Sequence, residues 1–92
     1  MNFKNNILVI YSPDFIKALT DQPAKTQKKA IKMEEILKTN PLHPSLRIHK
    51  LEGKLKGLWS IAINLSVRII FKPQDNGDFL FLSIGTHSIY DK

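Results

Sequence analysis

Two runs of alternating apolar and polar residues in the second half of the chain constrain its fold most strongly. They cover residues 59–63 and 67–71, and a period of two is typical of strands that bury one face. If residues 64–66 form a turn, three cross-strand pairs share one face: Trp59–Phe71, Ile61–Ile69 and Ile63–Val67. A slip of one residue would send all of them to the other face, so the pattern fixes an antiparallel register.

A third strand is predicted over residues 79–84, because Asn76-Gly77 is a typical two-residue hairpin turn. That turn pairs Phe71 with Leu82 and Ile69 with Ile84. The face opposite the core is then predicted to carry Ser60, Ala62, Arg68, Ile70, Lys72, Phe81, Ser83 and Gly85. Arg68 lies opposite both Ala62 and Gly85, and His87 projects from the same face because it follows Gly85 by two residues.

The first half of the chain predicts one short strand and two helices. Residues 7–11 are β-prone, and Ser12-Pro13-Asp14 has the composition of a helix start, with the helix reaching about Leu19. A second helix is expected from about Pro23 to just before Asn40-Pro41. Its core side is predicted to carry Ala30, Met33, Ile36 and Leu37, and its neighbouring stripe of Lys25, Lys28 and Lys32 is interpreted as solvated.

These elements predict an α+β fold of order β-α-α-β-β-β, in which an N-terminal strand and two helices pack on a twisted antiparallel sheet. The length of 92 residues suits a single domain over residues 1–92. A net charge of +6 favours an acidic partner such as nucleic acid or an acidic protein. Cysteine is absent, which excludes disulfides and thiolate zinc sites. With no apolar run of membrane-spanning length and no signal-peptide pattern, we expect a cytoplasmic protein.

A candidate site follows from the face that carries Arg68. His87 and Tyr90 end the last strand, and His49 precedes the first strand of the meander. Imidazole exchanges protons near neutral pH, and guanidinium donates two hydrogen bonds to phosphate. The segment before the sheet supplies further cations, namely Arg47, Lys50, Lys54 and Lys56. Such a set suits metal-independent cleavage of an RNA phosphodiester, which needs a base, an acid and cationic donors.

No metal site and no cofactor are expected. The three histidines do not have helical ligand spacing, and no acidic cluster accompanies them. His43, which precedes Pro44, is interpreted as a loop residue.

From His49 to Tyr90 the chain resembles the RelE/ParE toxin superfamily, in particular its RelE-, HigB- and YafQ-like ribosome-dependent mRNA endonucleases. The resemblance rests on residues 49–61 (HKLEGKLKGLWSI), 67–72 (VRIIFK) and 84–88 (IGTHS), and on the order of the predicted elements. It implies a toxin of a type II toxin–antitoxin system that cleaves mRNA in the ribosomal A site and is neutralised by a cognate antitoxin.

The resemblance also implies roles for individual residues. His87 matches the general acid or base at this strand end in YafQ-like members, and His49 their upstream histidine. Arg68 matches the phosphate-contacting arginine of RelE-like members, and Lys54 and Lys56 fall where these toxins place basic residues on RNA. The chain departs from the pattern at Ala62, where relatives commonly carry arginine or histidine, and at Tyr90, which is one residue closer to the histidine than usual.

Ala62 keeps a second interpretation open. A non-catalytic relative would only bind its antitoxin, and a ParE-like relative would act on DNA gyrase. Ile70, Phe79 and Phe81 on the non-core face are expected to be exposed and to form part of the antitoxin interface.

Overall fold

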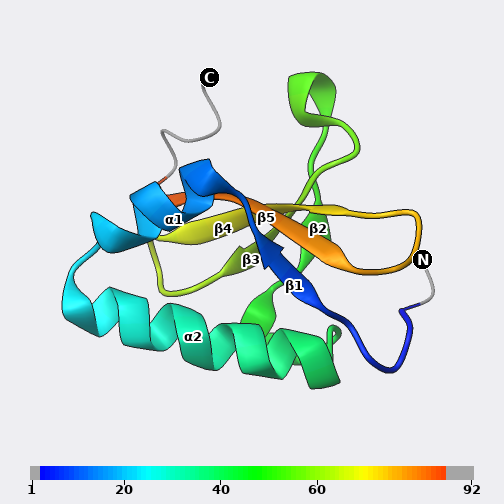
Figure 1. Cartoon of the computed structure of the whole chain (residues 1–92), viewed down its shortest axis with the longest axis horizontal. Helices are drawn as coiled ribbons and strands as arrows, with labels where there is room; N and C mark the ends of the chain where they lie inside the picture. The colour runs from blue at the N-terminus through cyan, green and yellow to red at the C-terminus, as the bar shows by residue number, and fades with distance from the viewer. Residues whose placement is uncertain (1–2, 87–92) are drawn as a thin grey trace.

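The computed structural model, which describes residues 3–86, contains two helices and a five-stranded mixed sheet (Figure 1). Its helices and strands are β1 (Val9–Tyr11), α1 (Pro13–Thr20), α2 (Ala24–Thr39), β2 (His49–Lys50), β3 (Trp59–Ala62), β4 (Arg68–Pro73) and β5 (Phe79–Gly85). Two short 3-10 turns, η1 (Pro44–Leu46) and η2 (Gly53–Leu55), lie between α2 and β3. The α+β class is confirmed.

The order of the strands is β1-β5-β4-β3-β2. From β2 to β5 every pairing is antiparallel, and the sequence predicts this for β3, β4 and β5. The N-terminal strand joins the sheet rather than packing on it: β1 lies parallel to β5, with Val9 opposite Phe79. The sheet is therefore mixed, with one parallel pair at its β1 edge and antiparallel pairs elsewhere. The two-residue strand β2 was not predicted.

Both helices begin and end near the predicted positions. Ser12 caps α1, because its Oγ accepts a hydrogen bond from the Phe15 N–H at 3.0 Å, and Pro13 occupies the first turn. α2 ends at Thr39, one residue before Asn40-Pro41. Its predicted core stripe is confirmed, since Ala30, Met33 and Leu37 are buried and Ile36 packs against the same cluster.

The register of the β3–β4 hairpin is confirmed in full. Trp59 lies opposite Phe71, Ile61 opposite Ile69 and Ala62 opposite Arg68. The turn is organised by one side chain: Asn64 Oδ1 accepts hydrogen bonds from the N–H groups of Ser66 (2.9 Å) and Val67 (2.8 Å). An asparagine that bonds the backbone two and three residues ahead is a common way to close a tight turn.

The β4–β5 hairpin differs from the prediction at its turn. Pro73 pairs with Phe79, so the turn has one residue more than the expected Asn76-Gly77 pair. The Gly77 N–H donates to the Gln74 carbonyl at 2.9 Å, and Gly77 has a φ of 93°. This is the three-residue loop in which a left-handed glycine follows a type I turn. Phe71 consequently pairs with Phe81, and the predicted pairing of Phe71 with Leu82 is wrong.

A β-bulge then restores the predicted register. Ile70 pairs with Ser83 while Phe71 pairs with Phe81, which leaves Leu82 as the extra residue on β5. Beyond the bulge, Ile69 pairs with Ile84 and Arg68 with Gly85, as predicted.

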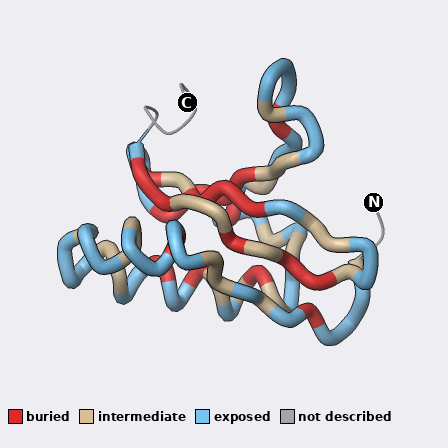
Figure 2. Tube along the Cα trace, turned by 45° about the horizontal axis from the view of Figure 1, so that its top comes forward, coloured by how far each residue is buried: buried red, intermediate tan, exposed pale blue. Residues whose placement is uncertain are grey.

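The longer turn moves two aromatic side chains into the core. Phe79 is 1% exposed and Phe81 is 0% exposed, so their predicted place on the exposed face is wrong. The Phe81 ring lies 5.2 Å from that of Phe15 in α1, measured between ring centroids. Ile70 stays on the outer face by register but is also buried. These three residues therefore cannot form the exposed antitoxin surface that the sequence suggested. Figure 2 shows buried residues concentrated in the sheet and many exposed residues along α2 and in the loop around η2.

The turn end of β5 is fixed to the N-terminal segment by Asp78. This carboxylate is buried, forms an ion pair with Lys4 Nζ at 2.7 Å and accepts the Leu8 N–H at 3.0 Å. The ion pair and the N–H bond hold the pKa of Asp78 below its ordinary value.

Candidate functional site

Arg68 stands at the first position of β4, and the strand register places it on the face that also carries Ala62 and Gly85. Its neighbours across the strands are Ala62 and Gly85, as predicted. One terminal nitrogen, Nη1, donates to the carbonyls of Asn64 at 2.6 Å and Val67 at 3.1 Å. The guanidinium is thus anchored to the β3–β4 turn through one nitrogen. Among residues 3–86 no hydrogen bond is recorded for Nη2 or Nε, and these two nitrogens have the geometry to donate two parallel hydrogen bonds to a phosphate.

His49 lies on the same face as Arg68, because it pairs with Ser60 across β2 and β3. Its ring is exposed, and Nδ1 lies 3.4 Å from the Arg47 carbonyl and 3.5 Å from Ser60 Oγ. Nδ1 can donate to the Arg47 carbonyl or accept from the Ser60 hydroxyl, depending on the tautomer. In the tautomer with the proton on Nδ1, Nε2 carries the lone pair that a base needs.

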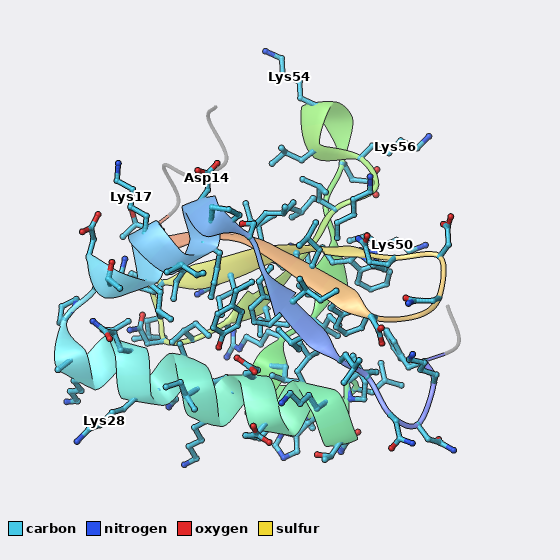
Figure 3. All side chains as sticks on the ribbon, viewed as in Figure 1. Asp14, Lys17, Lys28, Lys50, Lys54 and Lys56 are labelled. Atoms are coloured by element: carbon cyan, nitrogen blue, oxygen red, sulfur yellow. The ribbon has the colours of Figure 1, made fainter. Side chains whose placement is uncertain are left out.

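The three predicted lysines do not converge with Arg68 and His49. Lys50 neighbours His49 in β2 and therefore points to the other face, where its Nζ lies 5.6 Å from the centroid of the Trp59 ring. Lys54 and Lys56 are exposed on the loop around η2. They point away from the sheet in different directions (Figure 3). They can meet a large polyanion that covers this loop, but they do not line a common pocket with Arg68.

A basic groove lies beside Arg68. It is a cavity of about 500 Å³ between α2, the η1 segment and the β3–β4 turn. The residues that line it are Lys29, Lys32, Met33, Ile36, His43, Ser45, Arg47, Ala62, Ile63, Asn64, Leu65 and Arg68. Arg47, predicted to contact RNA, is part of this groove. It has a left-handed φ of 47° where it ends η1.

Sequence reasoning missed three members of this groove. Lys32 belongs to the α2 stripe interpreted as solvated, Lys29 was not considered, and His43 was interpreted as a loop residue. His43 in fact caps η1, with Nδ1 accepting the Ser45 N–H at 3.1 Å. The usable signal was the placement of α2 lysines directly beside the apolar core stripe. That signal does not say which other segment the lysines face.

His87 and Tyr90 lie outside the described residues. The last described strand ends at Gly85, which is buried opposite Arg68. The roles predicted for His87 and Tyr90 therefore stay predictions.

Within residues 3–86 there is no group of three or more histidine, cysteine, aspartate or glutamate side chains that could hold a metal ion. The helices of the same part of the chain are too short or too polar to span a membrane.

Comparison with known proteins identifies the fold. No protein-family model and no curated protein matches the chain. Among solved structures, YafQ from Escherichia coli superposes with a TM-score of 0.77 at 21% identity, covering 95% of this chain and 100% of YafQ. A chain of the toxin–antitoxin complex RelBE2 from Mycobacterium tuberculosis gives 0.74 at 15% identity, covering 89% and 99%. A chain of the YoeB–YefM complex from Staphylococcus aureus gives 0.71 at 22% identity, covering 89% and 98%.

These three structures match between 89% and 95% of this chain and at least 98% of their own chains. The protein therefore has the fold of the YafQ, RelE and YoeB toxins.

Proposed function

We propose that this chain is the toxin of a type II toxin–antitoxin pair and acts as a metal-independent endoribonuclease on ribosome-bound mRNA in the cytoplasm. The observation that carries the proposal is the placement of Arg68 and His49 on one face of a sheet whose fold is that of known toxins. The cognate antitoxin is the second proposed partner.

The chemistry follows from the two side chains. His49 Nε2 removes the proton of a ribose 2′-hydroxyl, and the 2′-oxygen then bonds to the adjacent phosphorus. The free nitrogens of Arg68 donate to the phosphate oxygens, where negative charge grows. The bond from phosphorus to the 5′-oxygen breaks, and that oxygen takes a proton from an acid. We assign this acid role to His87, and we assign Tyr90 to stacking against or orienting a base.

The lysines supply affinity rather than chemistry. Lys54 and Lys56 extend from the η2 loop, and Lys50 lies at the sheet edge. Each phosphate that they neutralise releases counterions, so binding to RNA is expected to weaken steeply with salt.

The test is cleavage of a defined mRNA on purified translating ribosomes, read by primer extension. Wild-type protein is expected to cut within the A-site codon. The variants His87→Ala, His49→Ala and Arg68→Ala are expected to cut at least about 100-fold more slowly, as is usual when a catalytic donor or base is removed. Lys17→Ala, on the exposed side of α1, is the control for a neutral surface change. Intact mRNA with wild-type protein would refute the nuclease proposal.

Ala62 favours a second candidate, a relative that binds an antitoxin without cutting RNA or, like ParE, acts on gyrase. Ala62 is 6% exposed and lies directly opposite Arg68, so the position offers no second cation to the phosphate. A ParE-like protein is expected to arrest growth with intact mRNA and altered plasmid supercoiling. A protein that only binds its antitoxin is expected not to arrest growth.

A further inference from the structure

The imidazole ring of His49 has two polar neighbours, and both lie at the same ring nitrogen. Nδ1 is 3.4 Å from the Arg47 carbonyl oxygen and 3.5 Å from the Ser60 hydroxyl oxygen. Ser60 is fully buried and pairs with His49 across β2 and β3, whereas the His49 ring is exposed. A neutral imidazole carries one proton, so the nitrogen that holds it decides what the other nitrogen can do.

The two tautomers of His49 do not satisfy these two contacts equally. A hydroxyl group can donate or accept, so the Ser60 contact suits either tautomer. A carbonyl oxygen can only accept, so it attracts a protonated Nδ1 and repels an unprotonated one. With the proton on Nδ1, one N–H donates to both oxygens in a three-centre hydrogen bond. The geometry therefore favours the tautomer that leaves the lone pair on Nε2.

The backbone of Arg47 determines where this carbonyl lies. Arg47 has φ 47° and ψ 46°, the left-handed conformation, and it is the one non-glycine residue with a positive φ among residues 3–86. This conformation is unfavourable for a residue with a Cβ atom, and it persists only where the surrounding structure holds it. At Arg47 the unfavourable conformation places the carbonyl at the ring of the candidate base.

Contacts on both sides of Arg47 hold its conformation. Its own N–H donates to the Pro44 carbonyl at 3.2 Å. Leu46, on one side, is fully buried, and Ile48, on the other, packs against the core cluster. The Arg47 side chain is exposed and lines the basic groove. The direction of the carbonyl thus depends on the packing of η1, and the guanidinium can be removed without changing that packing.

We propose that Arg47 is a positioning residue for His49: its main-chain carbonyl holds the ring proton on Nδ1 and so presents Nε2 as the base. The inference rests on the proposed function, because it names the group that prepares the base of that reaction. When Nε2 takes the proton of a ribose 2′-hydroxyl, the ring becomes a cation and keeps its Nδ1–H. The hydrogen bond to the carbonyl is then charge-assisted, which stabilises the cation.

His43 provides an internal control for the tautomer. Its Nδ1 accepts the Ser45 N–H at 3.1 Å, so a neutral His43 must carry its proton on Nε2. The structure therefore predicts opposite tautomers for His43 and His49. Ring ¹⁵N spectra of the full-length protein at alkaline pH, where imidazole is neutral, distinguish protonated from unprotonated nitrogens. The variants His43→Gln and His49→Gln assign the signals. We expect Nδ1–H at His49 and Nε2–H at His43.

Two substitutions separate the backbone of Arg47 from its side chain. Arg47→Gly removes the guanidinium and adopts a positive φ readily. Arg47→Val also removes it, but a β-branched residue strongly disfavours a positive φ. We expect the glycine variant to keep Nδ1–H at His49 and the valine variant to lose most of it. In ribosome-bound mRNA cleavage both should raise KM alike, and valine should lower kcat about 10-fold below glycine as the base-competent population falls.

Ser60→Ala tests the other neighbour of the ring. It removes the hydroxyl and leaves the Arg47 carbonyl, so His49 is expected to keep its proton on Nδ1. Loss of that signal would assign the tautomer to the hydroxyl and overturn the role of Arg47. A proton on Nε2 of His49 in the wild-type protein would overturn the inference directly, and so would equal tautomer populations in the glycine and valine variants.

The tautomer measurement uses neither ribosomes nor mRNA, so the two proposals fail separately. A protein that shows the expected tautomers but leaves mRNA intact contradicts the nuclease proposal alone. A protein that cleaves mRNA while neutral His49 carries its proton on Nε2 contradicts this inference alone.

Discussion

The two hairpins of the meander, β3–β4 and β4–β5, differ in the length of their turns and in the charged residues beside them. The β3–β4 turn is short and is closed by Asn64, and no aspartate or glutamate lines the basic groove beside it. The β4–β5 turn is one residue longer than predicted, and its buried Asp78 is paired with Lys4. Charge at one end of the sheet is neutralised and stabilises the fold, whereas charge at the other end remains available to a ligand. The β4–β5 end of the sheet therefore contributes to stability, and the β3–β4 end carries the candidate functional site.

The largest effect is expected for Phe81→Ala in the β4–β5 hairpin. Phe81 is fully buried and packs against Phe15, so we expect a loss of about 3–5 kcal/mol in the free energy of unfolding. Urea denaturation followed by circular dichroism measures it. Leu65→Ala, on the exposed turn of the other hairpin, is the control and should change stability by less than about 0.5 kcal/mol. A near-neutral Phe81→Ala would mean that this residue faces outward after all.

The second test compares the variants Arg68→Lys and Arg68→Ala in the β3–β4 hairpin. Alanine is expected to lower the rate of mRNA cleavage by about 10²–10³, the usual cost of a lost transition-state donor. Lysine keeps the charge but not the planar fork, so it should recover only part of that rate. Melting temperatures of both variants, measured in parallel, separate catalysis from the role of Arg68 in the turn. Full activity with lysine would show that charge alone is required.

A smaller effect is expected for Asn64→Ala. It removes the acceptor for the Ser66 and Val67 N–H groups, and a loss of about 1–2 kcal/mol in unfolding free energy should follow. Asn64→Asp keeps an acceptor at the same place and should restore most of the stability. If both variants unfold alike, the side chain does not organise the turn.

The smallest effect is a pH dependence at Asp78. Its pKa in the folded state is held below the ordinary value of 3.8 by Lys4 and by the Leu8 N–H. A lowered pKa stabilises the folded state above pH 3.8, and that contribution is lost as the pH falls through the folded-state value. Asp78→Asn should therefore be less stable than wild type at pH 6, with the gap closing below pH 3.8. Thermal unfolding across this range measures it, and a constant gap would contradict the assignment.

The sequence predicted the register of β3 and β4 because six apolar side chains had only one arrangement that put them all on the core face. It failed at the β4–β5 turn because Asn76-Gly77 is compatible with two loop lengths. The choice between them depends on tertiary burial: the longer loop places Phe79 and Phe81 in the core. The bulge at Leu82 then returned Arg68 to its predicted neighbours. A local error therefore left the candidate site correctly placed.

The site itself was predictable only where strand pairing determines it. Arg68, Ala62 and Gly85 are neighbours by register, and their grouping is confirmed. Lys29, Lys32, His43 and Arg47 meet Arg68 through the packing of α2 and η1 against the sheet. That packing joins segments far apart in the chain, and no local pattern encodes it. Lys50 was grouped with His49 because they are adjacent, although adjacent strand residues point to opposite faces.

The parallel pairing of β1 with β5 has a consequence for how the protein reaches its folded state. Within residues 3–86, β5 is the strand that pairs with β1, and the start of α1 is joined to β5 by the Ser12 N–H bond to the Phe81 carbonyl at 3.1 Å. The first strand and helix therefore acquire their partners only after the ribosome has synthesised residues 79–81. Contacts between such distant segments slow folding, because the intervening chain must be ordered before they form. A nascent chain of this protein thus stays without its completed sheet for most of its synthesis.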